Sequence, residues 1–167
     1  KEMAHQVLKL EALTDYSRNL TCSVGTITGG TLANVVPSEC NVSIDIRIPD
    51  MKTANEVMEI VEGLEPVDKD CTIAVAGGLD RPPYEKFDGI AKLFDHAKSL
   101  AAEIGFELKD LKTGGGSDGN FTGALGIPTL DGLGADGHGA HSFDEFIYYS
   151  SLEERTKLMI GLMETLE

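Results

Sequence analysis

The sequence is short of cysteine, of positive charge and of long apolar runs, and each shortage excludes a class of protein. Its three cysteines are scattered and form no Cys-x-x-Cys pair, which disfavours a disulfide scaffold and a structural zinc site and predicts a reducing cytoplasm. No apolar run approaches the roughly 20 residues of a membrane span. Fourteen lysines and arginines face 28 aspartates and glutamates, a net charge of −14, so we expect neither nucleic acid nor a membrane surface as a partner.

The chain also lacks a start signal. It begins Lys-Glu-Met-Ala, already inside a helical pattern over residues 1–13, with no capping residue before it. We therefore expect the 167 residues to be part of a longer polypeptide, with some of an active site outside them. Their composition, 41% hydrophobic and 25% charged, is that of a folded globular protein.

Residues 1–78 predict a small α+β domain. After the first helix, residues 21–28 are extended, and Val42 to Ile48 alternate apolar and polar side chains with the period of a strand. Thr53 and Glu56 predict a capping box that begins a second helix, and residues 70–76 predict a further strand. This order predicts a split βαβ, ferredoxin-like unit without its first strand.

Residues 79–167 predict a different, α/β pattern. An amphipathic helix over residues 90–104 stops at Gly105, and short strands are expected over 106–111 and 127–130. The final helix is expected to bury one face, made of Leu152, Thr156, Met159, Leu162, Met163 and Leu166. Strands that alternate with helices predict parallel pairing.

Two of the four histidines are candidates for chemistry. His5 and His96 lie in predicted helices, where a structural role is expected. His138 and His141 lie on a glycine-rich loop after a predicted buried strand, and such loops often carry function. Asp144 and Glu145 follow closely and could accept a hydrogen bond from an imidazole.

A second glycine-rich loop, residues 113–120, precedes a short helix. No Gly-Lys-Ser/Thr follows it, so a nucleotide phosphate loop is not supported. The loop is either a tight turn capped by Ser117 or Asp118 or a site for an anion such as a carboxylate. Arg47 could bind a carboxylate with its guanidinium or pair with Asp45 at the surface, and Asn34 could be an ordinary turn residue.

Four segments in order resemble the di-zinc exopeptidase and deacylase family. They are Gly30–Pro37, Asp45–Arg47, Thr113–Gly119 and Gly139–Ser142. This family includes glutamate carboxypeptidase, acetylornithine deacetylase and succinyl-diaminopimelate desuccinylase. The triple glycine and the Gly-Ala-His-Ser ending look most like the glutamate carboxypeptidase branch.

The resemblance implies an α/β enzyme with a ferredoxin-like lid. Residues 1–78 match most of the lid and dimerisation domain, and residues 79–167 match the C-terminal part of the catalytic domain. By resemblance, His141 is a zinc ligand and Asn34 reaches the partner subunit's site. The resemblance also implies which residues bind the substrate: Asn34, Arg47, Gly115, Gly116 and Ser117.

The resemblance also implies a reaction and what this chain lacks for it. Two zinc ions activate water to cleave an amide bond of a small peptide or N-acyl amino acid, in a homodimer. The other zinc ligands and the general base match nothing in these residues, so we expect the chain alone to be inactive and assign no catalytic residue. A non-catalytic dimerisation or binding module is the alternative.

Overall fold

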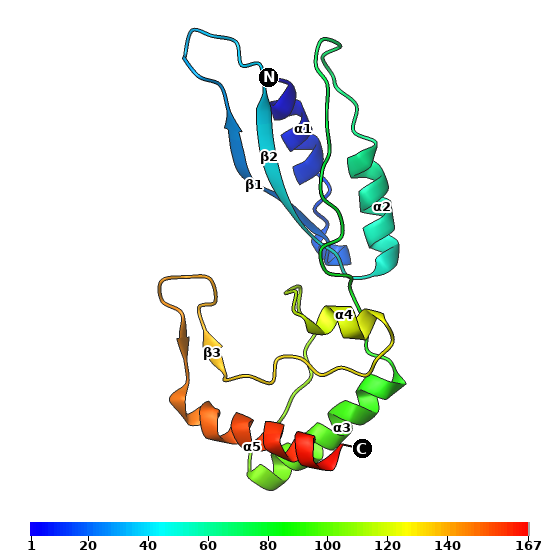
Figure 1. Ribbon diagram of the computed structural model, residues 1–167, viewed down its shortest axis with the longest axis vertical. Helices are drawn as coiled ribbons and strands as arrows, with labels where there is room; N and C mark the ends of the chain where they lie inside the picture. The colour runs from blue at the N-terminus through cyan, green and yellow to red at the C-terminus, as the bar shows by residue number, and fades with distance from the viewer. Residues whose placement is uncertain (167) are drawn as a thin grey trace. The chain divides into compact units, whose positions relative to one another are not determined.

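A computed structural model describes residues 1–166, and the chain divides into two compact units. The first comprises Lys1–Tyr84 with Gly114–Gly116, and the second comprises Glu85–Thr113 with Ser117–Glu167. Both mix helices with small antiparallel sheets, so the fold class is α/β, as expected (Figure 1). Among the described residues, no helix combines the length and the apolar character needed to cross a bilayer.

The first unit is a long β-hairpin with two α-helices on one face. Its elements are α1 (Glu2–Glu11), the 3₁₀ helix η1 (Tyr16–Arg18), β1 (Thr21–Gly29), β2 (Cys40–Arg47) and α2 (Met51–Glu62). The strands are antiparallel, with Thr21 opposite Arg47 and Gly29 opposite Cys40, and a bulge lies between Val24 and Thr26. The expected strands and helices are confirmed up to residue 62.

One apolar cluster holds this unit together. Leu10 of α1, Cys22 of β1 and Val57 and Val61 of α2 are buried in it. Side chains from β2 and from Ile48 just after it join from the same face of the hairpin, which is why Ile44, Ile46 and Ile48 alternate with exposed polar residues. The period of two therefore identified the inward face of this strand correctly.

The start of α2 and the segment after it differ from expectation. Asp50, not Thr53, caps the helix: its carboxylate accepts a hydrogen bond from the Thr53 N–H at 2.8 Å, and the Thr53 side chain is buried. Asp50 follows the end of the strand by three residues and directly precedes the first helical residue, which is the capping position. Residues 70–76 do not form a strand, because no neighbouring strand edge pairs with them.

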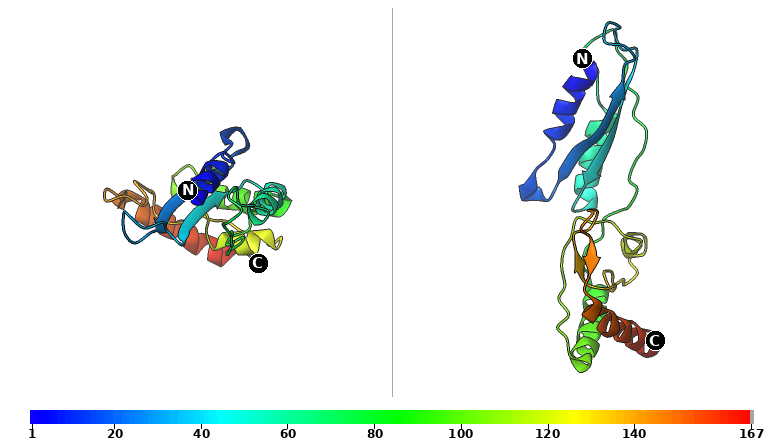
Figure 2. Two further views of the ribbon diagram at one scale, coloured as in Figure 1. Left: turned by 90° about the horizontal axis from the view of Figure 1, so that it is seen from above. Right: turned by 90° about the vertical axis from the view of Figure 1, so that its left-hand side faces the viewer.

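The second unit is built on two long helices. Its elements are α3 (Asp88–Ile104), α4 (Gly119–Ala124), β3 (Gly137–His138), β4 (Phe146–Ile147) and α5 (Tyr149–Thr165). The helix α3 ends at Gly105, whose φ of 111° suits glycine. The helices α3 and α5 pack against each other (Figure 2). Ala97 and Ala101 of α3 and Leu158 and Leu162 of α5 are buried between them.

Four expectations for this unit are wrong. Residues 106–111 and 127–130 form no strands, and the one strand pair among its described residues, β3 with β4, is antiparallel rather than parallel. Leu108 is buried against the two helices instead, so its apolar character reflects helix packing. The buried face of α5 is also displaced: it centres on Leu158, whereas Met163 is 72% exposed.

Candidate functional site

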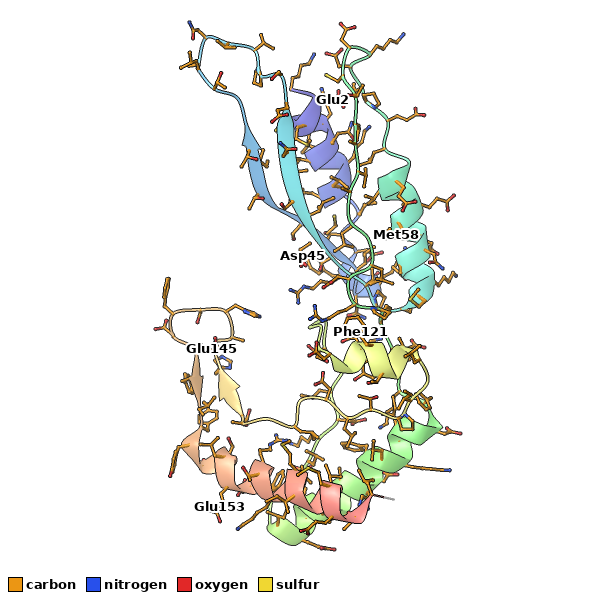
Figure 3. All side chains as sticks on the ribbon, in the orientation of Figure 1. Glu2, Asp45, Met58, Phe121, Glu145 and Glu153 are labelled. Carbon is orange, nitrogen blue, oxygen red and sulfur yellow. The ribbon has the colours of Figure 1, made fainter. Side chains whose placement is uncertain are left out.

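Arg47 ends the strand β2 and contacts the triple-glycine loop. Its Nη1 donates a hydrogen bond to the Gly114 carbonyl at 3.2 Å, and its Nε pairs with Asp45 at 2.9 Å. Asp45 lies two residues before Arg47, on the same exposed face of the strand. Figure 3 labels Asp45 on β2. The structure therefore contains the surface ion pair and also brings Arg47 to the loop where a carboxylate is expected.

The triple-glycine loop is flanked by a second arginine. A Cβ added to Gly116 would lie 3.0 Å from Cδ of Arg81, so the absence of a side chain permits this close approach. Arg81 also pairs with Asp80 at 2.8 Å. The sequence pattern at residues 81–83 predicted only a boundary, and the overlooked signal is an arginine three residues after Gly77-Gly78.

Ser117 organises the turn into α4. Its hydroxyl accepts a hydrogen bond from the Gly119 N–H at 3.1 Å, and its own N–H donates to the Asn120 side chain at 2.9 Å. Asp118 occupies the cap position without a side-chain cap bond. Ser117 therefore does the capping, and its backbone N–H already has a partner within the protein.

Asn34 lies far from Arg47 along the β1–β2 hairpin. It is exposed in the turn that connects the two strands, where the Val35 N–H donates to the Leu32 carbonyl at 3.1 Å. Arg47 is at the other end of β2, and eight residues of strand span about 25 Å. One small ligand on the same subunit cannot contact both side chains.

His141 lies in the loop between β3 and β4, where Figure 3 labels Glu145. Its φ is 65°, a left-handed conformation that is uncommon outside glycine. The Ser142 N–H and hydroxyl both donate to the Gly139 carbonyl, at 3.0 and 2.7 Å. Gly139 itself has a φ of 77°, and a Cβ there would lie 2.9 Å from the Asp144 carbonyl oxygen. These contacts hold the loop in a tight turn that presents the exposed His141.

The acidic residues of this loop do not act as expected. The Glu145 carboxylate accepts from the backbone N–H of His141 at 3.4 Å, not from the imidazole. His138 lies on β3 with its ring 6.5 Å from that of Phe146, and it lines an open depression together with Glu145.

These residues do not complete a metal site. Among the described residues, no group of three or more histidine, cysteine, aspartate or glutamate side chains is placed to hold a metal ion. A catalytic zinc needs about three protein ligands. The implied zinc therefore does not fit these residues alone, and His141 is at most one ligand of a larger set.

The first unit has the architecture of a small α+β domain with an exposed strand edge, and comparison with known proteins identifies its class. Residues 1–64 match the M20_dimer family, described as a peptidase dimerisation domain. This match covers the helix α1, the β-hairpin and the helix α2.

Curated relatives extend the similarity along the chain. Carboxypeptidase G2 of Pseudomonas sp. (strain RS-16) is 26% identical over 168 residues, which cover 97% of this chain and 40% of that protein. Succinyl-diaminopimelate desuccinylase of Magnetococcus marinus is 29% identical over 143 residues, which cover 83% of this chain and 36% of that protein. YqjE of Bacillus subtilis is 26% identical over 148 residues, which cover 86% of this chain and 39% of that protein.

The chain is thus similar to a peptidase dimerisation domain over residues 1–64 and, along most of its length, to a carboxypeptidase and a desuccinylase. The expected resemblance is thereby confirmed. The chain spans about two fifths of the length of the curated relatives that it matches.

Proposed function

We propose that these residues form part of a metal-dependent hydrolase that cleaves an amide bond next to a carboxylate-bearing residue. The substrate is a small peptide or an N-acyl amino acid, a carboxypeptidase or amidohydrolase reaction of the EC 3.4.17 or 3.5.1 kind. The names of the relatives, a carboxypeptidase and a desuccinylase, support this class. The observation that carries the proposal is the contact of Arg47 with the Gly114 carbonyl.

In this proposal the chain binds and orients rather than cleaves. Arg47 donates paired N–H groups to the substrate carboxylate, because a guanidinium matches the planar shape of that anion. Gly115, Gly116 and Ser117 line the same anion from the loop. His141 contributes one imidazole to a zinc site whose other ligands are not among these residues, and the intact enzyme holds two zinc ions.

We also propose that the protein is a homodimer through residues 1–78. The peptidase dimerisation domain matched by residues 1–64 supports this. Asn34, at the tip of the β1–β2 hairpin, then serves the active site of the partner subunit, since it lies too far from Arg47 to serve its own. The three free cysteines support a cytoplasmic location.

The substitution Arg47→Lys in the intact enzyme tests the carboxylate site. Lysine keeps the charge but cannot make two parallel hydrogen bonds, so KM for an N-acyl amino acid should rise by about tenfold with a smaller change in kcat. Arg155→Lys, on α5, is the matched control and should leave KM unchanged. An unchanged KM in Arg47→Lys would leave Arg47 as a surface residue paired with Asp45.

The dimerisation-domain match also favours a second candidate, a non-catalytic dimerisation or binding module. Zinc stoichiometry separates the two. An intact protein that binds no zinc and hydrolyses no N-acyl amino acid, but still dimerises, supports the module and contradicts the hydrolase.

A further inference from the structure

The β3–β4 hairpin is short, yet its loop carries the exposed His141. Each of its strands has two residues, Gly137–His138 and Phe146–Ile147, and they pair with each other. A two-stranded hairpin of this length is not stable on its own in water. The φ of 65° at His141 adds a further cost in free energy, because a left-handed backbone is unfavourable outside glycine. Contacts outside the two strands must therefore hold the hairpin in place.

Apolar packing of the hairpin supplies little of this stabilisation. Phe146 is 48% exposed and Ile147 is 56% exposed. The Phe146 ring meets the Tyr148 ring edge-on, with the ring centroids 5.3 Å apart. Since apolar stabilisation grows with the area removed from water, half-exposed side chains contribute less than core residues. The hydrogen bonds at the base of the hairpin are the stronger candidates for its anchor.

Asp136 and Tyr148 extend the hairpin by one pair at this base. The Tyr148 N–H donates to the Asp136 carbonyl at 2.8 Å. In a regular antiparallel ladder such a pair exchanges two bonds, so the second would run from the Asp136 N–H to the Tyr148 carbonyl. Tyr148, however, is the residue that precedes α5, and its carbonyl accepts the Ser151 N–H at 3.0 Å. The first turn of the helix thus uses the acceptor that a regular hairpin would use.

The hydroxyl of Ser151 replaces that acceptor. Its Oγ accepts a hydrogen bond from the Asp136 N–H at 2.9 Å and donates one to the Tyr148 carbonyl at 2.7 Å. These three residues form a closed set of hydrogen bonds, which we call the Ser151 latch, between the base of the hairpin and the start of α5. Next to the latch, the Gly137 N–H donates to the Asp136 carboxylate at 2.9 Å and so fixes the first residue of β3.

We propose that Ser151 is a positioning residue, which acts through the backbone of Asp136 to fix the hairpin that presents His141. Figure 3 labels Glu145 in the loop of this hairpin and Glu153 on α5, two residues after Ser151. The inference rests on the proposed function, in which the His141 imidazole takes part. A displacement of about 1 Å at a reacting group can lower a rate by about a hundredfold. The latch therefore matters for the reaction as well as for the local fold.

Three variants of the intact enzyme test the latch. Ser151→Ala removes the hydroxyl, Ser151→Thr keeps it, and Ser150→Ala removes the exposed hydroxyl beside it as a matched control. Hydrogen exchange measured by mass spectrometry follows a peptide over residues 136–147 and, as a reference for overall folding, a peptide over α3. We expect Ser151→Ala to speed exchange in the hairpin by about tenfold without a change in α3. Ser151→Thr and Ser150→Ala should match the wild type.

Steady-state kinetics with an N-acyl amino acid measure the effect on the reaction. We expect Ser151→Ala to lower kcat by about tenfold and to leave KM within about twofold of the wild-type value. KM is retained because Arg47, which binds the carboxylate in the proposed function, belongs to the first unit and the latch to the second. Ser151→Thr should restore kcat, since the hydroxyl is present again.

Three results would overturn the inference. They are unchanged hairpin exchange in Ser151→Ala, equally faster exchange in α3, and a loosened hairpin with an unchanged kcat. The second of these would mean that the hydroxyl serves general stability rather than the position of the loop. If the intact protein hydrolyses no N-acyl amino acid, the proposed function fails, while the exchange of residues 136–147 still decides whether Ser151 holds the hairpin.

Discussion

At the residue scale, His141 combines an exposed side chain with a left-handed backbone. A non-glycine residue in that region is about 1–2 kcal/mol less stable than in a right-handed conformation, and the hydrogen bonds of Ser142 to Gly139 keep it there. Backbone strain of this kind occurs often at functional sites.

We predict that His141→Ala in the intact enzyme removes bound metal and most activity, because one imidazole ligand is lost. His141→Asn is the better variant for interpretation, since asparagine tolerates the left-handed backbone and only the ligand changes. Metal content by atomic absorption and initial rates measure both effects. If both zinc ions and full activity persist, the assignment is wrong, and His138 becomes the next candidate.

The carboxylate of Glu2 is held by several hydrogen bonds of the fold. Its carboxylate accepts hydrogen bonds from Gln6 Nε2 at 2.5 Å and from the N–H groups of Val67 and Asp68 at 3.0 and 2.8 Å. These bonds, the one from Gln6 first, lower the pKa of Glu2 from 4.5 to about 2. The carboxylate thus ties the segment after α2 to the first turn of α1.

The lowered pKa predicts a pH dependence of stability. A carboxyl group whose pKa is depressed by folding stabilises the protein fully above the unfolded value of 4.5, and this contribution is lost as the pH falls toward 2. The difference in unfolding free energy between wild type and Glu2→Gln should therefore shrink between pH 5 and pH 2, measured by urea unfolding. Glu59→Gln, on the exposed side of α2, is the control, and an equal pH trend in both variants would contradict the assignment.

At the element scale, the packing of α5 against α3 stabilises the second unit. Leu158 is fully buried, and Gly161 brings α5 close to Leu100 of α3, whose Cδ1 would lie 3.5 Å from an added Cβ. The apolar residues around them on α5 are largely exposed, so few side chains account for this contact.

We predict that Leu158→Ala destabilises the second unit by about 2–5 kcal/mol, the usual cost of a large cavity in a core. Met163→Ala, on the same helix but 72% exposed in the wild type, should cost less than about 1 kcal/mol. Urea unfolding followed by circular dichroism compares the two. Equal effects of the two substitutions would show that the buried face of α5 has been assigned wrongly.

At the scale of the whole molecule, the two described sheets have only two strands each. Unpaired strand edges offer backbone N–H and C=O groups to another chain. Exposed apolar side chains on α5, including Ile160 and Met163, form a second surface that favours association with another chain. Together these features favour self-association of the 167-residue chain.

We predict that the purified chain folds at least in part, forms dimers or larger species and does not hydrolyse amides. A single candidate ligand, His141, cannot hold a two-zinc site. Sedimentation measures the assembly, equilibrium dialysis the zinc bound, and an N-acyl amino acid assay the activity. Zinc-dependent hydrolysis by the pure chain would falsify the prediction and mean that metal ligands have been missed.

Local patterns in the sequence determined the elements that depend on near neighbours. The period of two along Val42 to Ile48 identified the strand β2 and its inward face, and the stop at Gly105 marked the end of α3, because both depend on backbone geometry within a few residues. The order of four motifs also identified the relatives, and the comparisons confirm that resemblance.

Only the tertiary structure decided which apolar segments pair as strands and which side chains meet. Residues 106–111 look like a strand but bury Leu108 against helices, since strand formation needs a partner edge that local sequence does not specify. The close approach of Arg81 to Gly116 joins residues 35 positions apart, beyond the reach of any local pattern. Asp50 rather than Thr53 caps α2 for a related reason. The hairpin fixes where the chain leaves β2. That position decides which side chain reaches the first free N–H groups of α2.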